Sequence, residues 1–308
     1  MIRLVIDTDP GVDDAHAILL AAAHPDVRIE AITTVVGNNS LEHTTDNACK
    51  ILDLLGLETP VYRGSPRPLV HPANFASYFH GEDGLGDSGY PPSTRRVESE
   101  HAALALIRLA AESPGELTLA AIGPLTNLAL AMRLDPQLPG MYKDLMVMGG
   151  AVRAMGNTQN HSAEFNFWTD PEAAHIVLDG WPGVQLLPWE TAVEHTVPQA
   201  QVDRLMAVDS LRGEFFRRIT AKVLQFTEKR LGAPQLFAPD GLAIAAAIEP
   251  GFVLHREERH VRVELAGAIT RGQSTVDWYG QSVQQANVSL VLDIDDARFL
   301  ELLHAALA

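Results

Sequence analysis

Four carboxylates lie close together near the start of the chain. The stretch DTDPGVDDA begins at residue 7 and carries Asp7, Asp9, Asp13 and Asp14. Apolar runs, IRLVI before it and AILLA shortly after it, place this acidic stretch at the edge of the core. Like charges removed from water repel one another and need a compensating positive charge. Carboxylate oxygens from a strand end and a helix start are ligands that Ca²⁺ or Mg²⁺ prefers.

Helix-dipole stabilisation and zinc binding each account for less of the acidic stretch. Acids in the first turn of a helix stabilise its dipole, which would explain Asp13 and Asp14 but not Asp7 and Asp9. A zinc site lacks support because no pair of histidines or cysteines has the spacing of zinc ligands. The stretch therefore predicts a site for a hard divalent cation.

Strand-like and helix-like patterns alternate along the first 190 residues. Strands are expected at 2–6, 28–35, 116–122, 143–148 and 184–188. Helices are expected near 14–23, 40–56, 99–112, 124–134 and 170–179. The later part is more helical and ends with strand-like stretches at 260–269 and 287–293. This alternation predicts an α/β, Rossmann-like fold, with a mostly parallel central sheet flanked by helices and with helical and small β insertions. No linker or repeat is visible, so a single domain over 1–308 is expected.

Two polar loops follow expected elements and are candidates for ligand binding. Residues 80–90, HGEDGLGDSGY, contain four glycines and are typical of a mobile loop that closes over a ligand. Residues 149–166 are polar and follow an expected strand. Ligands of parallel α/β proteins bind beyond the carboxyl ends of the strands, so these loops and the acidic stretch should converge.

Composition excludes several classes of protein. The 308 residues carry a formal net charge of −16 and no basic stripe, which argues against binding to nucleic acid or to an anionic membrane surface. The single cysteine, Cys49, excludes an internal disulfide framework and is expected to be buried. No apolar run is long enough to span a bilayer, and residues 2–6 form an expected strand and not part of a signal peptide. A cytoplasmic protein is expected.

The acidic stretch and several later motifs together resemble one family. DTDPGVDDA resembles the N-terminal signature of the nucleoside hydrolases, which are ribonucleoside N-ribohydrolases, inosine-uridine preferring members among them, that use a bound Ca²⁺. The resemblance continues, in the family's order, through AITTVVGNNS (31–40), HGEDGLG (80–86), AIGPLTNLA (121–129), VMGG (147–150), AEFNFWTDPEAA (163–174) and PDGLA (239–243). It implies hydrolysis of the N-glycosidic bond of ribonucleosides to free base and ribose.

The resemblance also implies roles for individual residues. Asp9, Asp14, Asp240 and the backbone carbonyl of Ile122 would hold the Ca²⁺. Asp9, next to the water that attacks the sugar, is expected to be the general base. The implied ribose contacts are Asp13, Asn38, Asn157, Glu164 and Asn166. Asn160 is an alternative to Asn157, because the stretch before AEFN is longer here than the family spacing.

One position departs from the family pattern. Pyrimidine-accepting and broad-specificity members have a histidine directly before the distal metal aspartate, and this chain has Pro239 there. Proline has no proton to donate, so another group must assist the leaving base, and His80 and Trp278 are the first candidates. His161 in the polar loop is a further possible acid, and no acid at all is the other possibility. Phe167 and Trp168 are available for stacking, although packing in the core is the better account of them.

Other functions compete with hydrolysis of a nucleoside. Because of Pro239, a nucleoside-binding or regulatory protein with degraded turnover is one alternative. A Mg²⁺-dependent phosphohydrolase is another, because Asp7-Thr8-Asp9 follows the first strand, but the rest of the motif fits poorly. The expected partner is a ribonucleoside, and the resemblance implies a homodimer or homotetramer. The preferred nucleobase cannot be predicted from these motifs.

Overall fold

Eight strands form one central sheet. The structure, a computed structural model, describes residues 1–308. The strand order is β3-β2-β1-β4-β5-β6-β10-β7, and every strand is parallel to its neighbours except β7, which is antiparallel to β10. The bounds are β1 (Ile2–Thr8), β2 (Val27–Thr34), β3 (Val61–Arg63), β4 (Leu117–Ala121), β5 (Asp144–Met148), β6 (Val184–Leu187), β7 (Val253–Arg259) and β10 (Val288–Ile294). A separate antiparallel pair consists of β8 (Val261–Val263) and β9 (Ser274–Val276).

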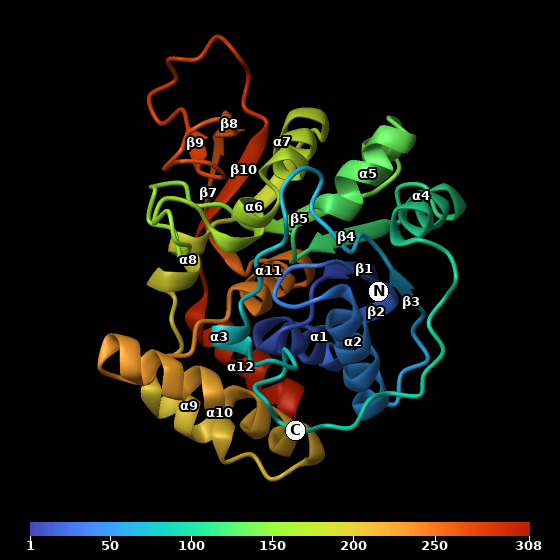
Figure 1. Cartoon of the computed structure of the whole chain (residues 1–308), viewed down its shortest axis with the longest axis vertical. Coiled ribbons are helices and arrows are strands. Elements are labelled where there is room, and N and C mark those ends of the chain that lie inside the picture. Colours follow the sequence, from blue (N-terminus) through green and yellow to red (C-terminus); the bar gives the residue numbers. More distant parts are fainter.

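Helices cover both faces of the sheet, as the sequence predicts. Figure 1 shows α1, α2 and α12 on one side of it and α4, α5 and α7 on the other. The bounds are α1 (Val12–Ala23), α2 (Leu41–Leu55), α3 (Ser77–His80), α4 (Ala102–Glu112), α5 (Thr126–Leu134), α6 (Phe165–Thr169), α7 (Pro171–Gly180), α8 (Trp189–Glu194), α9 (Gln199–Met206), α10 (Leu211–Leu231), α11 (Pro239–Ile248) and α12 (Asp296–Leu307), with a 3-10 turn at Leu138–Gly140. None of these helices combines the length and apolarity needed to cross a membrane.

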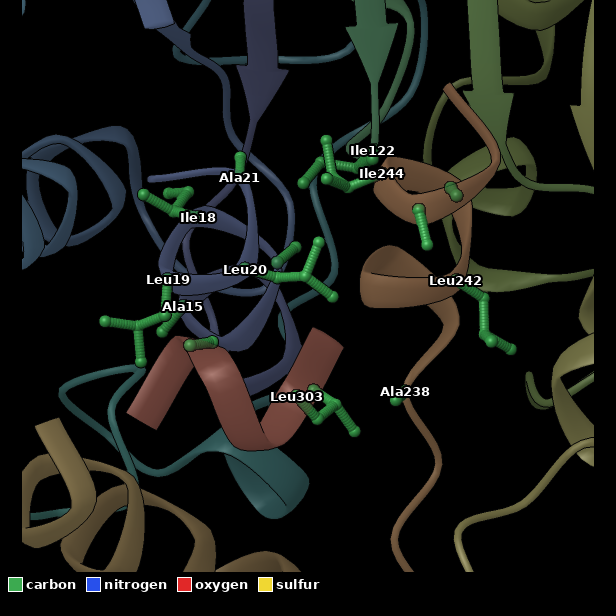
Figure 2. Close-up of a cluster of buried hydrophobic side chains, with 14 of the residues drawn as sticks. Ala15, Ile18, Leu19, Leu20, Ala21, Ile122, Ala238, Leu242, Ile244 and Leu303 are labelled. Carbon is green, nitrogen blue, oxygen red and sulfur yellow. The ribbon is translucent and has the colours of Figure 1, made fainter. Parts of the chain in front are cut away.

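The core consists of two apolar layers, one on each face of the sheet. Successive residues of a strand point to opposite faces, so Leu4 and Ile6 of β1 pack in the layer of α1 whereas Val5 packs in the layer of α4 and α5. In the first layer, Figure 2 shows side chains of α1, α11 and α12 clustered together, among them Leu242 and Leu303. Because both faces are covered, the central strands are continuous apolar runs.

The order of the strands creates a crevice at the carboxyl ends of β1 and β4. From β1 the chain goes on to β2 and β3 on one side, while β4, β5 and β6 lie on the other side. The loops after β1 and β4 therefore diverge, and ligands of such folds bind between them. The turn after β1 is short, because Gly11 already caps α1 and donates its N–H to Asp14 Oδ2 at 2.9 Å. The first helix thus begins directly at the crevice.

The predicted strand at 260–269 is largely wrong. Only 261–263 form a strand, because Glu264 Oε1 accepts the N–H groups of Ala266 (2.7 Å) and Gly267 (3.0 Å) and turns the chain. The strand that lies beside β10 on the side away from β6 is instead β7, which the sequence analysis missed. Its sequence, VLHREER, is rich in charge because it forms an exposed edge of the sheet, and it therefore lacks a clear apolar pattern.

Candidate active site

Acidic side chains converge at the crevice between β1 and β4. We use the name acidic centre for Asp9, Asp13, Asp14 and Asp240. The first three come from the β1–α1 turn and the first turn of α1, and Asp240 comes from the first turn of α11. Asp9, Asp14 and Asp240 are buried, and Asp13 is half-buried. The sequence placed these carboxylates at strand and helix ends, and the fold brings them together.

Hydrogen bonds fix the carboxylate of Asp14 on both of its oxygens. Oδ1 accepts the hydroxyl of Thr8 at 2.5 Å and the N–H of Asp9 at 3.2 Å. Oδ2 accepts the N–H of Gly11 at 2.9 Å and the side-chain amide of Asn38 at 3.0 Å. These donors come from β1, from the β1–α1 turn and from the loop after β2. The orientation of Asp14 is therefore set by the protein alone.

Asp9 lies in a narrow slot and keeps one free oxygen. Its Oδ2 accepts the N–H of Asn38 at 2.6 Å, whereas its buried Oδ1 has no hydrogen-bond partner. A Cβ atom added to Gly37 would lie 2.0 Å from Asp9 Oδ2, and one added to Gly123 would lie 2.6 Å from Oδ1. The carboxylate thus fits between two glycines, one after β2 and one after β4. A buried oxygen without a partner is costly unless a ligand completes it.

Asp7 belongs to a different network from the acidic centre. Its Oδ2 accepts the hydroxyl of Thr33 at 2.5 Å and the side-chain amide of Asn127 at 2.8 Å. Asn127 also donates to the carbonyl of Thr34 at 3.1 Å. Burial raises the pKa of Asp7 to about 7. Asp7 therefore joins β1, β2 and α5 beneath the crevice.

The acidic centre has the electrostatics of a cation site. Burial, followed by the repulsion of Asp13, Asp14 and Asp9, holds the pKa of Asp240 well above its ordinary value. Burial also raises the pKa values of Asp13 and Asp14 to about 6. No lysine or arginine forms an ion pair with these carboxylates; the one basic neighbour is a histidine, His80. Oxygen ligands without thiolate or imidazole fit a hard cation such as Ca²⁺ or Mg²⁺.

The carboxylates that approach one another most closely differ in part from those expected to bind metal. Oxygens of Asp13, Asp14 and Asp240 all lie within 4.8 Å of one another. Asp14 and Asp240 belong to the expected ligand set, whereas Asp13 was expected to contact ribose. The carbonyl of Ile122, the fourth expected ligand, accepts the side-chain amide of Asn166 at 3.0 Å. This cluster of aspartates is able to hold a metal ion.

Glu164 and Asn166 line the crevice from the side of β5. Glu164 caps α6: its Oε1 accepts the N–H of Asn166 at 2.8 Å, and its Oε2 accepts the N–H groups of Gly150 (2.9 Å) and Phe167 (3.2 Å). Asn166 also donates to the carbonyl of Met148 at 3.3 Å, at the end of β5. Burial raises the pKa of Glu164 to about 7. Both side chains are buried and held in place by these hydrogen bonds.

The two asparagines that competed for a ribose contact are placed differently. Asn157 is exposed, and its side chain makes no hydrogen bond. Asn160 is half-buried, and its Oδ1 accepts from Thr158 Oγ1 at 2.9 Å and from two backbone N–H groups. His161, a candidate acid, is exposed and has a positive φ of 63°. The structure therefore brings none of the three to the acidic centre.

His80 lies against the first turn of α1. Its Nδ1 accepts the N–H of Val12 at 3.1 Å and lies 3.7 Å from Asp13 Oδ1. Because Nδ1 is an acceptor, the proton of the neutral ring is assigned to Nε2. Burial lowers the pKa of His80 to about 4, so the ring is neutral at pH 7. His80 is the one expected leaving-group residue that contacts the acidic centre.

The glycine-rich loop after His80 is closed against the rest of the molecule. Asn39 and Asn47 donate their side-chain amides to the carbonyls of Glu82 and Asp83, each at 2.8 Å. At its far end Asp87 forms an ion pair with Lys222 of α10. These contacts connect the loop to the segment after β2, to α2 and to α10, and in this conformation the loop presents His80 to the first turn of α1; its expected mobility stays a prediction.

Trp278 makes its polar contacts outside the acidic centre. Its indole N–H donates to the carbonyl of Val152 at 3.3 Å, and the guanidinium of Arg259 lies 5.9 Å from the ring centroid. Phe167 is fully buried beneath the turn that follows β5, so it is part of the core, as expected. Trp168 is half-buried.

An aromatic pair that the sequence analysis missed belongs to segments that lead into the site. The rings of Trp189 and Phe237 are 5.5 Å apart, and both side chains are half-buried. Trp189 donates its backbone N–H to the carbonyl of Gly150 at 2.9 Å, at the carboxyl end of β5, and Phe237 lies three residues before Asp240. The position of Phe237 next to the PDGLA motif was the one signal in the sequence.

Comparisons with known proteins agree on one family. A model of the family described as "Inosine-uridine preferring nucleoside hydrolase" matches residues 4–301. The inosine-uridine preferring nucleoside hydrolase of Leishmania major is 35% identical over 303 residues, covering 96% of this chain and 94% of that protein. The pyrimidine-specific ribonucleoside hydrolase RihB of Escherichia coli O17:K52:H18 is 32% identical, covering 95% and 93%.

A solved structure agrees with the sequence relatives. The inosine-guanosine nucleoside hydrolase (IG-NH) superposes with a TM-score of 0.93 at 36% identity, covering 100% of this chain and 99% of that one. The match spans the sheet, both layers of helices and the acidic centre. The chain therefore belongs to the inosine-uridine preferring nucleoside hydrolase family, and it is an enzyme of that family.

Proposed function

We propose that this enzyme hydrolyses the N-glycosidic bond of ribonucleosides to give the free base and ribose. The observation that carries this proposal is Asp9 Oδ1, a buried oxygen without a partner beside three clustered carboxylates at the crevice. Family membership supports the reaction class, and the acidic centre supports chemistry on a sugar that becomes positively charged. Carboxylates can serve two purposes at such a site: they hold a cation, and they assist cleavage of a glycosidic bond.

The cation is Ca²⁺, held by Asp9, Asp14 and Asp240 with the carbonyl of Ile122. The donor set supports this proposal because it consists of oxygens alone. Asp9 Oδ1 has no hydrogen-bond partner, and Ile122 O accepts one hydrogen bond, from Asn166, which leaves a second lone pair for a cation. When bound, the ion supplies the positive charge that fixes sugar hydroxyls and lowers the pKa of a water. Asp13 lies within the same cluster and balances that charge from the ribose side.

Residues around the acidic centre orient the ribose. Asp13, Asn38, Glu164 and Asn166 are the proposed sugar contacts, and all four lie around the crevice. Asn157 is left out of this set because its side chain is exposed. A site built to pair with hydroxyl groups rejects a sugar that lacks one, because the buried partner is then left unpaired. Ribonucleosides are therefore preferred to 2-deoxyribonucleosides.

Asp9 acts as the general base. Cleavage of the bond gives the ribosyl ring an oxocarbenium character, which nearby carboxylates stabilise. The ligand that lies next to the attacking water is the group placed to take its proton, and the resemblance assigns that place to Asp9.

The leaving base departs without an acid at position 239. His80 is one candidate to assist it by hydrogen bonding: the ring is neutral at pH 7, so its Nε2–H can donate a hydrogen bond to the base, but the ring holds almost no imidazolium that could transfer a proton. Stacking is the other, with Trp278 as the residue expected from the sequence and the Trp189–Phe237 pair as the one that the structure adds. A purine accepts a proton at N7 from water, so purine nucleosides should be better substrates than pyrimidine nucleosides.

One experiment tests the reaction and the metal together. Base release is measured from inosine, guanosine, uridine and cytidine, with and without exhaustive chelation, followed by addition of Ca²⁺. We expect release that is lost on chelation and restored by Ca²⁺. Asp9→Asn should lower kcat by about 10³-fold or more, while Asp209→Asn, an exposed aspartate without partners, serves as the matched control. Full activity in metal-free enzyme would refute the cation's role.

A nucleoside-binding protein without turnover is the second candidate, and Pro239 is the observation that favours it. Calorimetric binding of inosine without base release from any nucleoside would support it. That result would refute the proposed hydrolysis.

The remaining proposals concern the domain organisation, the oligomeric state and the location of the protein. We infer a single domain over 1–308, because β1 and β10, from opposite ends of the chain, belong to one sheet. The homodimer or homotetramer is proposed from the family resemblance, and the cytoplasmic location is the one expected from the sequence. Light scattering on the purified protein tests the oligomeric state.

A further inference from the structure

A bidentate ion pair fixes the turn between β8 and β9 on α7. Arg271 donates from Nη1 to Glu172 Oε1 and from Nη2 to Glu172 Oε2, both at 2.8 Å. The two side chains are 20% and 22% exposed, so the pair is largely shielded from water. Arg271 Nη1 also donates to the carbonyl of Leu265 at 3.0 Å, across the same turn. Paired hydrogen bonds of this kind restrict both position and orientation.

The β8–β9 turn also holds part of the polar loop that precedes Glu164. Asn160 donates its side-chain amide to the backbone carbonyl of Arg271 at 2.7 Å, and Ser162 donates its hydroxyl to the carbonyl of Ile269 at 3.1 Å. Close packing reinforces these bonds, since a Cβ added to Gly272 would lie 2.8 Å from the Cα of Trp168. The turn therefore contacts the loop through two side-chain hydrogen bonds, and it packs against α6 at Gly272.

Asn160 connects the β8–β9 turn to Ala163, the residue that precedes Glu164. Its Oδ1 accepts the N–H groups of Ser162 (3.2 Å) and Ala163 (3.1 Å). The hydroxyl of Thr158 donates to the carbonyl of Ala163 at 2.9 Å. Segment 158–163 is thus folded around one side chain, which is itself held by the β8–β9 turn. Glu164 follows this segment directly.

We propose that the Arg271–Glu172 pair is a positioning device that keeps the sugar-binding residues Glu164 and Asn166 in their binding conformation. The proposal rests on the proposed function, because it takes these two residues as ribose contacts. Arg271 does not touch the substrate itself. When the pair is lost, segment 158–163 spends only a fraction of its time in the competent conformation, and the apparent affinity falls by that fraction. Once the nucleoside is bound, the chemistry is unchanged.

Steady-state kinetics of one variant and one control test whether the pair affects substrate affinity and not the chemical step. Arg271→Met keeps the length of the side chain but removes its charge and its hydrogen bonds. We expect KM for the best ribonucleoside to rise about tenfold while kcat stays within about threefold. The matched control is Arg108→Met on α4, which breaks a comparable pair with Glu100 (2.9 Å) and should leave both constants unchanged. A fall in kcat with an unchanged KM would overturn the proposal.

Two double variants separate positioning from a general loss of structure. Each single charge change, Arg271→Glu or Glu172→Arg, should raise KM. Combining the two restores a pair of opposite charges and should bring KM part of the way back to the wild-type value. Asn160→Ala should raise KM as Arg271→Met does, and combining these two should add little because both break the same connection. If Asn160 contacts ribose directly, the two effects multiply instead, which would overturn the proposed path.

Hydrogen exchange gives a readout that does not depend on activity. The amides of Ser162 and Ala163 are protected by Asn160 Oδ1, so their exchange should accelerate in Arg271→Met and stay unchanged in Arg108→Met. Unchanged exchange in Arg271→Met would overturn the inference, as would faster exchange with wild-type KM in an active enzyme. If the wild type releases no base from any nucleoside, the proposed function fails, and exchange alone decides whether Arg271 holds the segment.

Discussion

Replacing Gly37 by alanine should disable Asp9 while leaving the fold intact. The new Cβ would lie 2.0 Å from Asp9 Oδ2 and 2.8 Å from Asp9 Cγ, whereas ordinary contacts begin at 3.4 Å. The carboxylate would have to move by about 1.4 Å, and Gly123 on the opposite side blocks that movement. Gly37 does not have a positive φ, so alanine brings a steric clash and no backbone strain.

The size of the effect follows from this displacement. A misplacement of about 1 Å in a catalytic site costs about 10²-fold in rate. Overpacking a well-packed region costs about 1–3 kcal/mol, which a domain with a stability of about 5–15 kcal/mol tolerates. We therefore expect Gly37→Ala to lose about 100-fold in kcat/KM and to bind Ca²⁺ more weakly, while it still unfolds cooperatively.

The assay compares base release, calorimetric Ca²⁺ binding and thermal unfolding in three variants. Gly123→Ala should behave like Gly37→Ala, because its Cβ would lie 2.6 Å from Asp9 Oδ1. Gly140→Ala is the matched control, since its Cβ would meet no atom within 4 Å. Wild-type kcat/KM in Gly37→Ala, with wild-type affinity for Ca²⁺, would show that the position of Asp9 does not matter and would refute the reasoning.

Three further predictions concern other parts of the molecule. Thr8→Val removes the 2.5 Å hydrogen bond to Asp14 Oδ1, and we expect metal affinity, measured by calorimetry, to fall by about tenfold or more; an unchanged affinity would mean that the other donors suffice. Burial raises the pKa of the Cys49 thiol to about 11, so at pH 8 it should react with a thiol reagent only after unfolding; rapid labelling of the native protein contradicts this. Trp189→Leu should lower kcat/KM for inosine more than for para-nitrophenyl riboside, whose nitrophenolate leaving group departs without help, and an equal loss for both substrates would argue against stacking.

Much of the fold could be predicted because the central strands are buried on both faces. Stretches such as LVI and LTLAA are continuous apolar or β-branched runs for that reason, and their order with the helices leaves few possible topologies. The edge strand β7 escaped prediction because its outer side is solvated and its sequence is charged. The end of β8 depends on one side chain, Glu264, that folds back on the backbone, and such a contact has no periodic signature.

The acidic centre could be predicted in its membership but not in its internal arrangement. Asp9, Asp14 and Asp240 each follow a strand or begin a helix, and the fold places such positions at one edge of the sheet. The closeness of Asp13 to Asp14 and Asp240, and the exposure of Asn157, depend on distances between loops that the sequence does not encode locally. The Trp189–Phe237 pair joins residues far apart in the chain, and only the folded structure brings the two rings together.

The crowding of like charges in the acidic centre links the stability of the fold to the ions around it. Each carboxylate there has a raised pKa, which means that its ionised form opposes folding at pH 7 when no cation is present. A neutral replacement such as Asp240→Asn should therefore make the metal-free protein more stable, although it weakens the site. Binding of a cation to the native state alone raises stability with the logarithm of its concentration. The melting temperature of the wild type should therefore rise with the concentration of free cation. Selecting variants for stability in the absence of the cation would favour loss of the same carboxylates that the enzyme needs.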